Sequence, residues 1–257
     1  MASLSAIVEF LDHELRTREV PDYAGALNGL QAQNNGTVTH VAAAVDGSAF
    51  AVRAAADRGA DLLLVHHGMF WGGATPLVGA AYDRARLVIE KNIAIYSSHI
   101  PLDLHPTWGN NVLLAKALGL QPTGGFAIMR GVAVGVSGET DMPTKELRDR
   151  AAAFSAGFGT TLVSTPLRDA QRTRRWAMCS GAGASPDTLR EAADLGIDTL
   201  IVGEGPHHTA VQAADAGLTI MYLGHYATET LGVRALANEL AARFSIKSSF
   251  VEASTGL

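Results

Sequence analysis

The chain has 257 residues, of which 47% are hydrophobic and 18% charged, and its formal net charge is −5 at pH 7. This is the balance of a globular protein with ample material for a core, and no run of Lys and Arg marks a nucleic-acid or membrane surface. The single cysteine, Cys179, excludes an intrachain disulfide framework and suits a reducing compartment, so we expect a cytoplasmic protein with no membrane span.

In the first part of the chain, helical and extended patterns alternate. The charged residues within the first helix distinguish it from a signal peptide. We expect helices at residues 5–18, 49–58, 82–91 and from about 110, and strands at 40–47, 61–65 and 92–97.

The centre of the chain has a different character. Residues 124–140 predict one or two strands, a helix follows from near Thr144, and residues 158–175 are polar and rich in turns. Alternation then resumes, with Ser185 and Pro186 as N-cap and first residue of a helix that ends at Gly196. We expect the remaining strands at 175–181, 198–205 and 218–224 and the remaining helices at 208–216 and up to Phe244. This alternation predicts an α/β protein with parallel strands.

The first and last parts of the chain contain similar sequence segments in the same order. RGADLLLVHHG (58–68) matches LGIDTLIVGEG (195–205), and NIAIYSSHIPLD (92–103) matches GLTIMYLGHYATE (217–229). In each copy a Tyr precedes a His by three residues and a carboxylate follows that His by four. We interpret this as an internal duplication into two similar α/β halves, although unrelated βα units can also resemble one another. The expected domains are 1–125 completed by 223–257, and 126–222, with a metal site in the cleft between them.

The chemistry-bearing residues follow strands in both copies. His66 and His67 come directly after the strand at 61–65, and the pairs His99–Asp103 and His225–Glu229 follow two others. Imidazole and carboxylate together suit Zn, Fe, Mn, Co or Ni, and five or six such groups with a bridging carboxylate can hold two cations about 3.5–4 Å apart. Each residue alone could instead be a surface or capping residue, as we expect for the histidines His13, His40, His105, His207 and His208.

Four motifs resemble one known family. NGLQ (28–31), LVHHGMFW (64–71), HIPLDLHPTWGNN (99–111) and GHYATETLGVRAL (224–236) are similar to those of the Nif-three-like family, described as GTP cyclohydrolase 1 type 2 homologues. The resemblance extends over nearly the whole chain and is weakest in the middle. It implies a two-domain α/β protomer, a toroidal homohexamer, and a dinuclear metal centre.

The resemblance also assigns residues. The metal ligands would be His66, His67, Asp103, His225 and Glu229, with Glu229 bridging two divalent ions, and His99 would either contact the ligands without binding metal or transfer a proton. One departure is GEGPHH (203–208), where many members read GE followed by a small residue, Ser and Glu. Glu204 is kept, but the change bears on loop contacts and substrate choice.

The favoured function is a dinuclear metal-dependent hydrolase of the GTP cyclohydrolase type 2-like kind, which would open a purine nucleotide ring, with His99 or Glu204 carrying a proton. The P-loop pattern GxxxxGK[ST] does not occur. One alternative is a ring-shaped metal-binding regulatory or interaction protein, and another is a metal-dependent phosphoesterase linked to nucleic-acid metabolism. The net charge argues against nucleic-acid binding, although RDAQRTRR (168–175) is a local basic cluster.

Overall fold

A computed structural model describes residues 1–73 and 75–256 and divides the chain into two compact units. Unit 1 comprises Met1–Trp108 and Gly232–Ala253, and unit 2 comprises Gly109–Leu231 and Ser254–Leu257. The boundaries therefore fall at 108/109 and 231/232, where the sequence suggested 125/126 and 222/223. The helix after residue 109 belongs to unit 2 because its apolar side chains pack in that unit's core.

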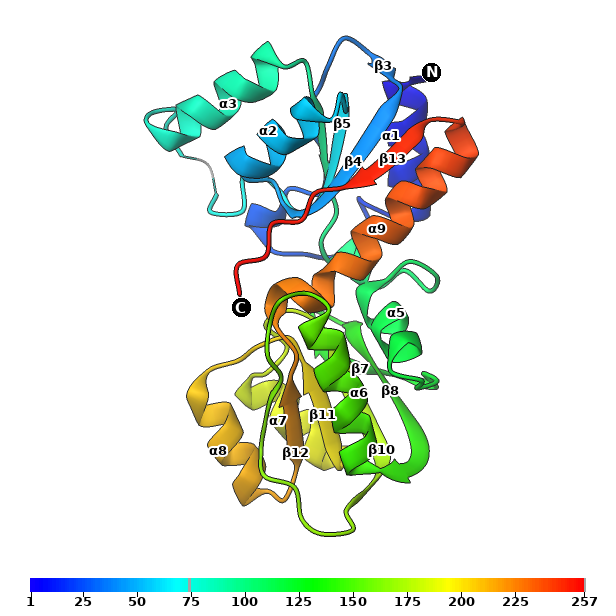
Figure 1. Cartoon of the computed structure of the whole chain (residues 1–257), viewed down its shortest axis with the longest axis vertical. Helices are drawn as coiled ribbons and strands as arrows, with labels where there is room; N and C mark the ends of the chain where they lie inside the picture. Colours follow the sequence, from blue (N-terminus) through cyan, green and yellow to red (C-terminus); the bar gives the residue numbers. More distant parts are fainter. Residues whose placement is uncertain (74, 257) are drawn as a thin grey trace. The chain divides into compact units, whose positions relative to one another are not determined.

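Unit 1 is an α/β unit with one main sheet (Figure 1). Its elements are β1 (Ala2–Ser3), α1 (Leu4–Glu14), a 3-10 helix (Ala24–Ala26), β2 (Gly29–Ala32), β3 (Thr37–Val38), β4 (His40–Asp46), α2 (Ala49–Asp57), β5 (Leu62–His67), α3 (Ala80–Glu90), β6 (Ala94–Ser97), α4 (Ile100–Asp103), the later part of α9 (His225–Phe244) and β13 (Lys247–Phe250). The strand order is β13-β4-β5-β6-β2, in which only β2 runs antiparallel to its neighbour.

Both faces of this sheet are covered by helices, which is why its central strands are almost wholly apolar. Alternate residues of β4 and β5, such as Val41 and Leu62, pack against α1 and α9. The intervening residues, such as Ala42 and Leu63, pack against α2 and α3. The sheet is therefore the middle of three layers, and the carboxyl ends of its parallel strands lie at one edge.

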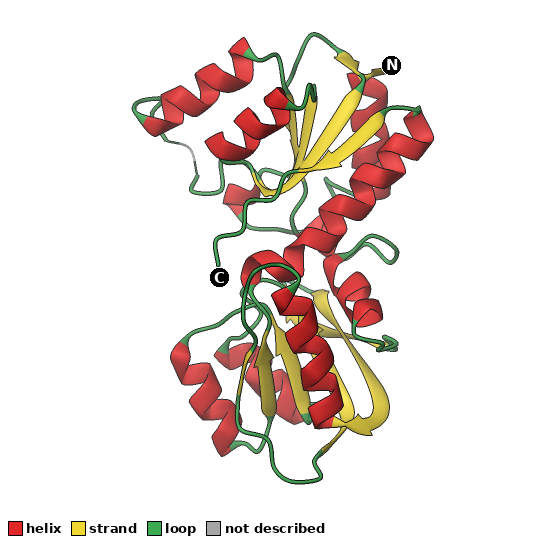
Figure 2. Cartoon of the chain, in the orientation of Figure 1, coloured by secondary structure: helices red, strands yellow, loops and turns green. Residues whose placement is uncertain are grey.

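Unit 2 repeats this plan with more antiparallel strands (Figure 2). Its elements are α5 (Asn110–Ala117), β7 (Gly124–Met129), β8 (Val132–Pro143), α6 (Thr144–Ala156), β9 (Val163–Ser164), β10 (Arg172–Cys179), α7 (Pro186–Asp194), β11 (Thr199–Val202), α8 (His207–Asp215), β12 (Thr219–Tyr222) and the first residues of α9. The order is β7-β8-β10-β11-β12-β9, with β10, β11 and β12 parallel. Side chains of α5 and α6 pack around the buried Trp176 on one face of the sheet.

The two units share a connectivity that the sequence repeat predicts. β4-α2-β5-α3-β6-α4 in unit 1 corresponds to β10-α7-β11-α8-β12-α9 in unit 2, and an antiparallel strand borders the third parallel strand in each. Gly59 and Gly196 follow corresponding helices with φ of +72° and +65°. This left-handed conformation ends a helix at little cost only for glycine.

The repeated aspartates also have the same role. The carboxylate of Asp61 accepts hydrogen bonds of 2.9–3.1 Å from backbone N–H groups at the start of β4. The carboxylate of Asp198 accepts two of 2.9 Å from N–H groups near the start of β10. Each aspartate therefore ties the start of its own strand to the neighbouring strand.

Most of the predicted helices and strands are confirmed, including the Ser185 N-cap and Pro186 at the first position of α7. One expectation at the candidate site was wrong: β5 does not stop at Val65 but includes His66 and His67. The strands β2 and β13 were not predicted, because GLQA and KSSF lack an apolar alternation. Among the described residues, no helix combines the length and the apolar character that a membrane-spanning helix requires.

Replacement of Asp61 by Ala should lower the free energy of unfolding by about 1–3 kcal/mol, because the N–H groups at the start of β4 lose their hydrogen-bond acceptor. Urea denaturation checks this. Asp57→Ala, at the exposed end of α2, is the matched control and should stay within about 0.5 kcal/mol of wild type. Equal stability of the two variants would contradict the role given to Asp61.

Candidate metal centre

Two adjacent imidazoles lie at the end of the central strand of unit 1. His66 is fully buried and His67 is 9% exposed. Neighbouring residues of a strand normally point to opposite faces, yet these two rings have centroids only 4.9 Å apart. Gly68 follows directly, and the side chain of Gln31 occupies the space where a Cβ at Gly68 would lie. A side chain at position 68 would therefore displace the Gln31 amide from the strand end.

A third imidazole, that of His99, follows the neighbouring parallel strand β6 and lies beside the first two. His99 precedes α4, and its ring nitrogens lie with those of His66 and His67 so that one ligand atom from each is within 4.8 Å of the others. Asp103, the last residue of α4, brings its Oδ2 to 3.6 Å from Nε2 of His66. Two ligands of one ion, each about 2.0–2.2 Å from it, are themselves about 3.0–3.5 Å apart, so this spacing is close to that of a shared ion.

Each of the three imidazoles has its Nδ1 beside an oxygen. The partners are the carbonyl of Ser98 for His66 (3.0 Å), the carboxylate of Asp46 for His67 (3.0 Å) and the carboxylate of Asp22 for His99 (2.9 Å). A carbonyl or ionised carboxylate can only accept, so the proton of a neutral ring resides on Nδ1 and the lone pair on Nε2. This is the arrangement that orients metal-binding histidines.

The ionised state of Asp22 follows from its surroundings. Burial by itself would raise the pKa of this carboxyl, but hydrogen bonds from His99, from Asn28 and from the N–H of Tyr23 outweigh it and hold the pKa below its usual value. Asp22 is therefore an anion at neutral pH and can only accept from His99.

The NGLQ segment supports the site from behind. Asn28 accepts from the N–H of His99 (2.8 Å) and donates to Asp22 (2.8 Å). Gln31 accepts from the N–H of Met69 (2.7 Å), just after the two strand-end histidines. These two amides fix the loops that carry the imidazoles.

Unit 2 has a corresponding pair of groups at the start of α9. Nδ1 of His225 lies 2.8 Å from the carboxylate of Glu204, and Nε2 lies 3.1 Å from Oε2 of Glu229. Burial would lower the pKa of this histidine, but its hydrogen bonds to Glu229 and Glu204 prevail and raise the pKa to about 9. A divalent cation could take the place of the proton between Nε2 and Glu229, because that spacing matches two ligands of one ion.

A glycine makes room for Glu229. At Gly181, where φ is +60°, a Cβ would lie 2.1 Å from Oε1 of Glu229 and 3.3 Å from Nε2 of His225. The loop after β10 can approach the carboxylate only because this position lacks a side chain.

The structure thus groups the predicted residues by unit. His66, His67, His99 and Asp103 come together in unit 1, and His225, Glu229 and Glu204 come together in unit 2. The remaining histidines have other contacts: His13 with Glu14, His40 with Ser249, and His105 with the ring of Trp108, while His207 and His208 are exposed in the first turn of α8.

Sequence reasoning missed Asp22, Asp46 and Gly181. Asp46 had a weak signal, because it ends a strand whose neighbour ends in His67, and the two residues are paired in register. Asp22 had none.

The basic cluster at 168–175 is balanced by acids. Arg172 and Arg174 lie 2.5 Å and 3.9 Å from the carboxylate of Asp141, and Arg175 lies 3.5 Å from that of Glu139. These acids offset part of the positive charge of the cluster, which makes it a weaker candidate for the basic patch that nucleic-acid binding uses.

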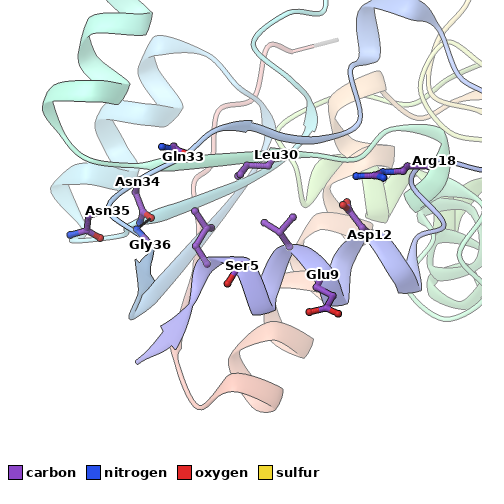
Figure 3. Close-up of a pocket in the computed structure, with 11 residues that line it drawn as sticks. Ser5, Glu9, Asp12, Arg18, Leu30, Gln33, Asn34, Asn35 and Gly36 are labelled. Carbon is purple, nitrogen blue, oxygen red and sulfur yellow. Dashed lines mark hydrogen bonds between the residues drawn. The ribbon is translucent and has the colours of Figure 1, made fainter.

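A groove of about 790 Å³ also lies in unit 1, between α1 and the segment that carries Leu30. Figure 3 shows Asp12 and Arg18 at one end and Asn35 and Gly36 at the other. Its lining contains no histidine. The groups suited to metal chemistry gather elsewhere, so the histidine cluster is the candidate site.

Known proteins are similar to this chain in both sequence and fold. The family Duf34/NIF3 (NGG1p interacting factor 3) matches residues 2–256. A GTP cyclohydrolase 1 type 2 homolog of Deinococcus radiodurans is 37% identical, covering 98% of this chain and 93% of its own, and one of Halobacterium salinarum is 39% identical, covering 93% and 94%. The crystal structure of TTHA1606 from Thermus thermophilus is 32% identical with a TM-score of 0.84 and covers all of both chains.

Replacement of Gly181 by Ala should displace the Glu229 carboxylate and weaken binding of Zn²⁺ or Mn²⁺. Gly217→Ala is the matched control, because Gly217 has a similar φ of +70° but nothing within 4 Å of the added Cβ. Both changes strain the backbone, and only the first should alter metal affinity in a competition titration against a chromogenic chelator. Equal metal affinity in the two variants would contradict the role given to Gly181 in making room for the Glu229 carboxylate.

Proposed function

Because the chain belongs to the Duf34/NIF3 (NGG1p interacting factor 3) family, we propose that it is a hydrolase that depends on two divalent metal ions. The proposed ligands are His66, His67, Asp103, His225 and Glu229, with Glu229 bridging. The native ion is one of Zn, Fe, Mn, Co or Ni, since imidazole and carboxylate are the donors.

One observation carries this proposal. The Nδ1 of every proposed histidine ligand faces an oxygen: the carbonyl of Ser98 and the carboxylates of Asp46 and Glu204. A structural core histidine needs one hydrogen bond, but a ligand needs its ring fixed and its Nε2 basic, and an acceptor oxygen on Nδ1, from a carbonyl or a carboxylate, supplies both. The donor set therefore fits a metal centre.

The number of donors argues that both units serve one centre. In the described part of unit 2, His225 and Glu229 offer two ligands, fewer than the three or four that tight binding needs. Unit 1 offers His66, His67 and Asp103, which leave open positions on a single ion. We propose that the five groups act together, as the duplicated spacing suggests.

The bound ions would lower the pKa of a shared water toward neutrality and polarise the bond to be cleaved. The protein itself supplies orientation and proton transfer. His99 is the better candidate for the proton, because its Nδ1 is held by the anionic Asp22 and its ring belongs to the imidazole cluster. This histidine–carboxylate pair can accept a proton at Nε2 and return it to the leaving group. Glu204, which contacts Nδ1 of His225, is proposed to position that ligand.

The proposed reaction adds one water across a C–N bond of a purine ring. For GTP the attack would be at C8 of guanine and would open the imidazole ring, without oxidation or reduction. Support for this substrate comes from the name of the relatives, GTP cyclohydrolase 1 type 2 homolog, and the same residues would also suit hydrolysis of phosphoesters or cyclic amides. We further propose a homohexamer in the cytoplasm, the assembly that the family resemblance implies and the compartment that a lone cysteine suits.

Glu229→Ala should lose bound metal and abolish hydrolysis, because it removes the proposed bridge. Metal analysis of untagged wild type should give about two ions per chain, and GTP, phosphoesters and cyclic amides should be screened with each ion. Glu239→Ala, on the same helix, is the control. An active, folded and metal-free protein would overturn the proposal. Loss of the oligomer in Glu229→Ala would instead favour a structural role for the metals.

His99→Asn should lower kcat by about 10²- to 10⁴-fold while metal content stays at the wild-type level, because it removes a proton carrier and no ligand. Glu204→Gln keeps an oxygen for Nδ1 of His225 and should have a much smaller effect on kcat. Steady-state kinetics with metal analysis of each variant checks both. Loss of an ion from His99→Asn would show that His99 is a ligand.

A further inference from the structure

Two aromatic rings lie against the imidazoles of unit 1. The ring centroid of Trp71 is 4.7 Å from that of His67 and 4.6 Å from that of His99. Tyr23 comes from a different segment, and its centroid is 6.0 Å from that of His99 and 6.4 Å from that of Trp71. The two aromatic planes meet at 73°. We call Tyr23 and Trp71 the aromatic corner.

The corner is exposed although its surroundings are buried. Trp71 is 41% exposed and Tyr23 is 51% exposed, whereas His66, His67 and His99 are each 9% exposed or less. The other two tryptophans are used differently, since Trp176 is fully buried and Trp108 stacks on His105. The site thus presents aromatic surface to solvent on top of a nearly closed set of imidazoles.

The backbone holds both rings in place. At Gly25, two residues after Tyr23, a Cβ would lie 2.5 Å from the carbonyl oxygen of Trp71, so the two segments touch and only glycine permits the approach. Asp22 accepts from the N–H of Tyr23 (2.6 Å) and holds Nδ1 of His99 (2.9 Å). The aromatic surface is therefore positioned by the same groups that orient the histidines.

A phosphate cradle is not provided by the glycine-rich loop after β10. Three of its N–H groups are already used: that of Gly181 donates to Thr228, that of Gly183 to Gly181 and that of Ala184 to Glu204. Ser185 and Thr188 form a capping box at the start of α7. A ring-bearing substrate would need another feature for recognition.

We propose that the aromatic corner binds the purine ring of the substrate by stacking and so selects for a planar heteroaromatic ring at this site. This rests on the proposed function, whose reaction acts on such a ring. A base stacked on one member of the corner meets the edge of the other, and these are the two geometries that aromatic pairs prefer. Tyr23 and Trp71 are thus specificity-determining residues, and their neighbours Gly25 and Asp22 position them.

Guanosine 5′-monophosphate, with ribose 5-phosphate as the probe that lacks the ring, tests this on the full-length protein. Titrations are followed by tryptophan fluorescence and calorimetry, on metal-free protein and on protein loaded with Zn²⁺ or Mn²⁺ and freed of excess ion. Wild type should bind the monophosphate more tightly than ribose 5-phosphate. Binding of the monophosphate should quench the tryptophan fluorescence, and Trp71→Phe should remove this quenching.

Trp71→Ala and Tyr23→Ala should each weaken binding of guanosine 5′-monophosphate by at least about fivefold, the lower limit expected for loss of one base–aromatic stack. Neither should change binding of ribose 5-phosphate. Tyr82→Ala is the matched control, because Tyr82 on α3 is also 51% exposed. The inference is overturned if the variants bind the monophosphate as wild type does, if both probes bind equally, or if wild type binds the monophosphate in neither state.

Metal titration of the same variants separates this inference from the proposed function. Trp71→Ala and Tyr23→Ala should keep wild-type metal content, since neither residue offers a ligand. If metal binds and the affinity for guanosine 5′-monophosphate does not depend on the aromatic corner, the inference fails and the proposed hydrolase function stands. If ring binding depends on the corner but no ion binds wild type, the proposed hydrolase fails and the corner stands as a ring-binding site.

Discussion

The hydrogen bond at Nδ1 of each site histidine is the interaction on which the rest of the site depends. An imidazole on its own can rotate and can carry its proton on either nitrogen. Oxygens from Ser98, Asp46 and Asp22 remove both freedoms in unit 1, and Glu204 does the same for His225 in unit 2. Of the three carboxylates only that of Asp22 is buried, and the cost of its burial is offset by three further donors: Asn28 and the N–H groups of Tyr23 and Ile100.

The α/β plan explains why these hydrogen bonds can form at all. Parallel strands end at the same edge of a sheet, so residues that follow β4, β5 and β6 meet there without any local signal in common. Asp46 faces His67 in the register of two neighbouring strands, and His99 comes from the turn after the third. In unit 2 the ends of β11 and β12 bring Glu204 to His225 in the same way. At the opposite ends of the strands, Asp61 and Asp198 tie the starts of β5 and β11 to the neighbouring strand.

Prediction from sequence succeeded where spacing carried the information. The histidines, the carboxylates four residues after His99 and His225, the helix cap at Ser185 and most of the strands were all visible as patterns. Asp22 was not, because its contacts with His99, Asn28 and Ile100 join segments far apart in the chain. The unit boundary was misplaced for the same reason, since α5 is assigned by packing on Trp176 rather than by its own residues. Strand β5 extends through His66 and His67 because pairing with β4 continues to Asp46.

Glycine sets the limits of the candidate site as firmly as the histidines and carboxylates do. Gly68 admits the Gln31 side chain, Gly25 admits the carbonyl of Trp71, and Gly181 admits the carboxylate of Glu229. At each position a single methyl group would move a functional side chain or the loop that bears it. A carboxylate or an imidazole could be supplied by many sequences, but the close approach of loops to them requires a residue without a side chain. The HHG motif of unit 1 and the SGAG loop of unit 2 therefore follow the same principle, each within its own unit: the histidines or the glutamate supply the donors, and a glycine gives them room.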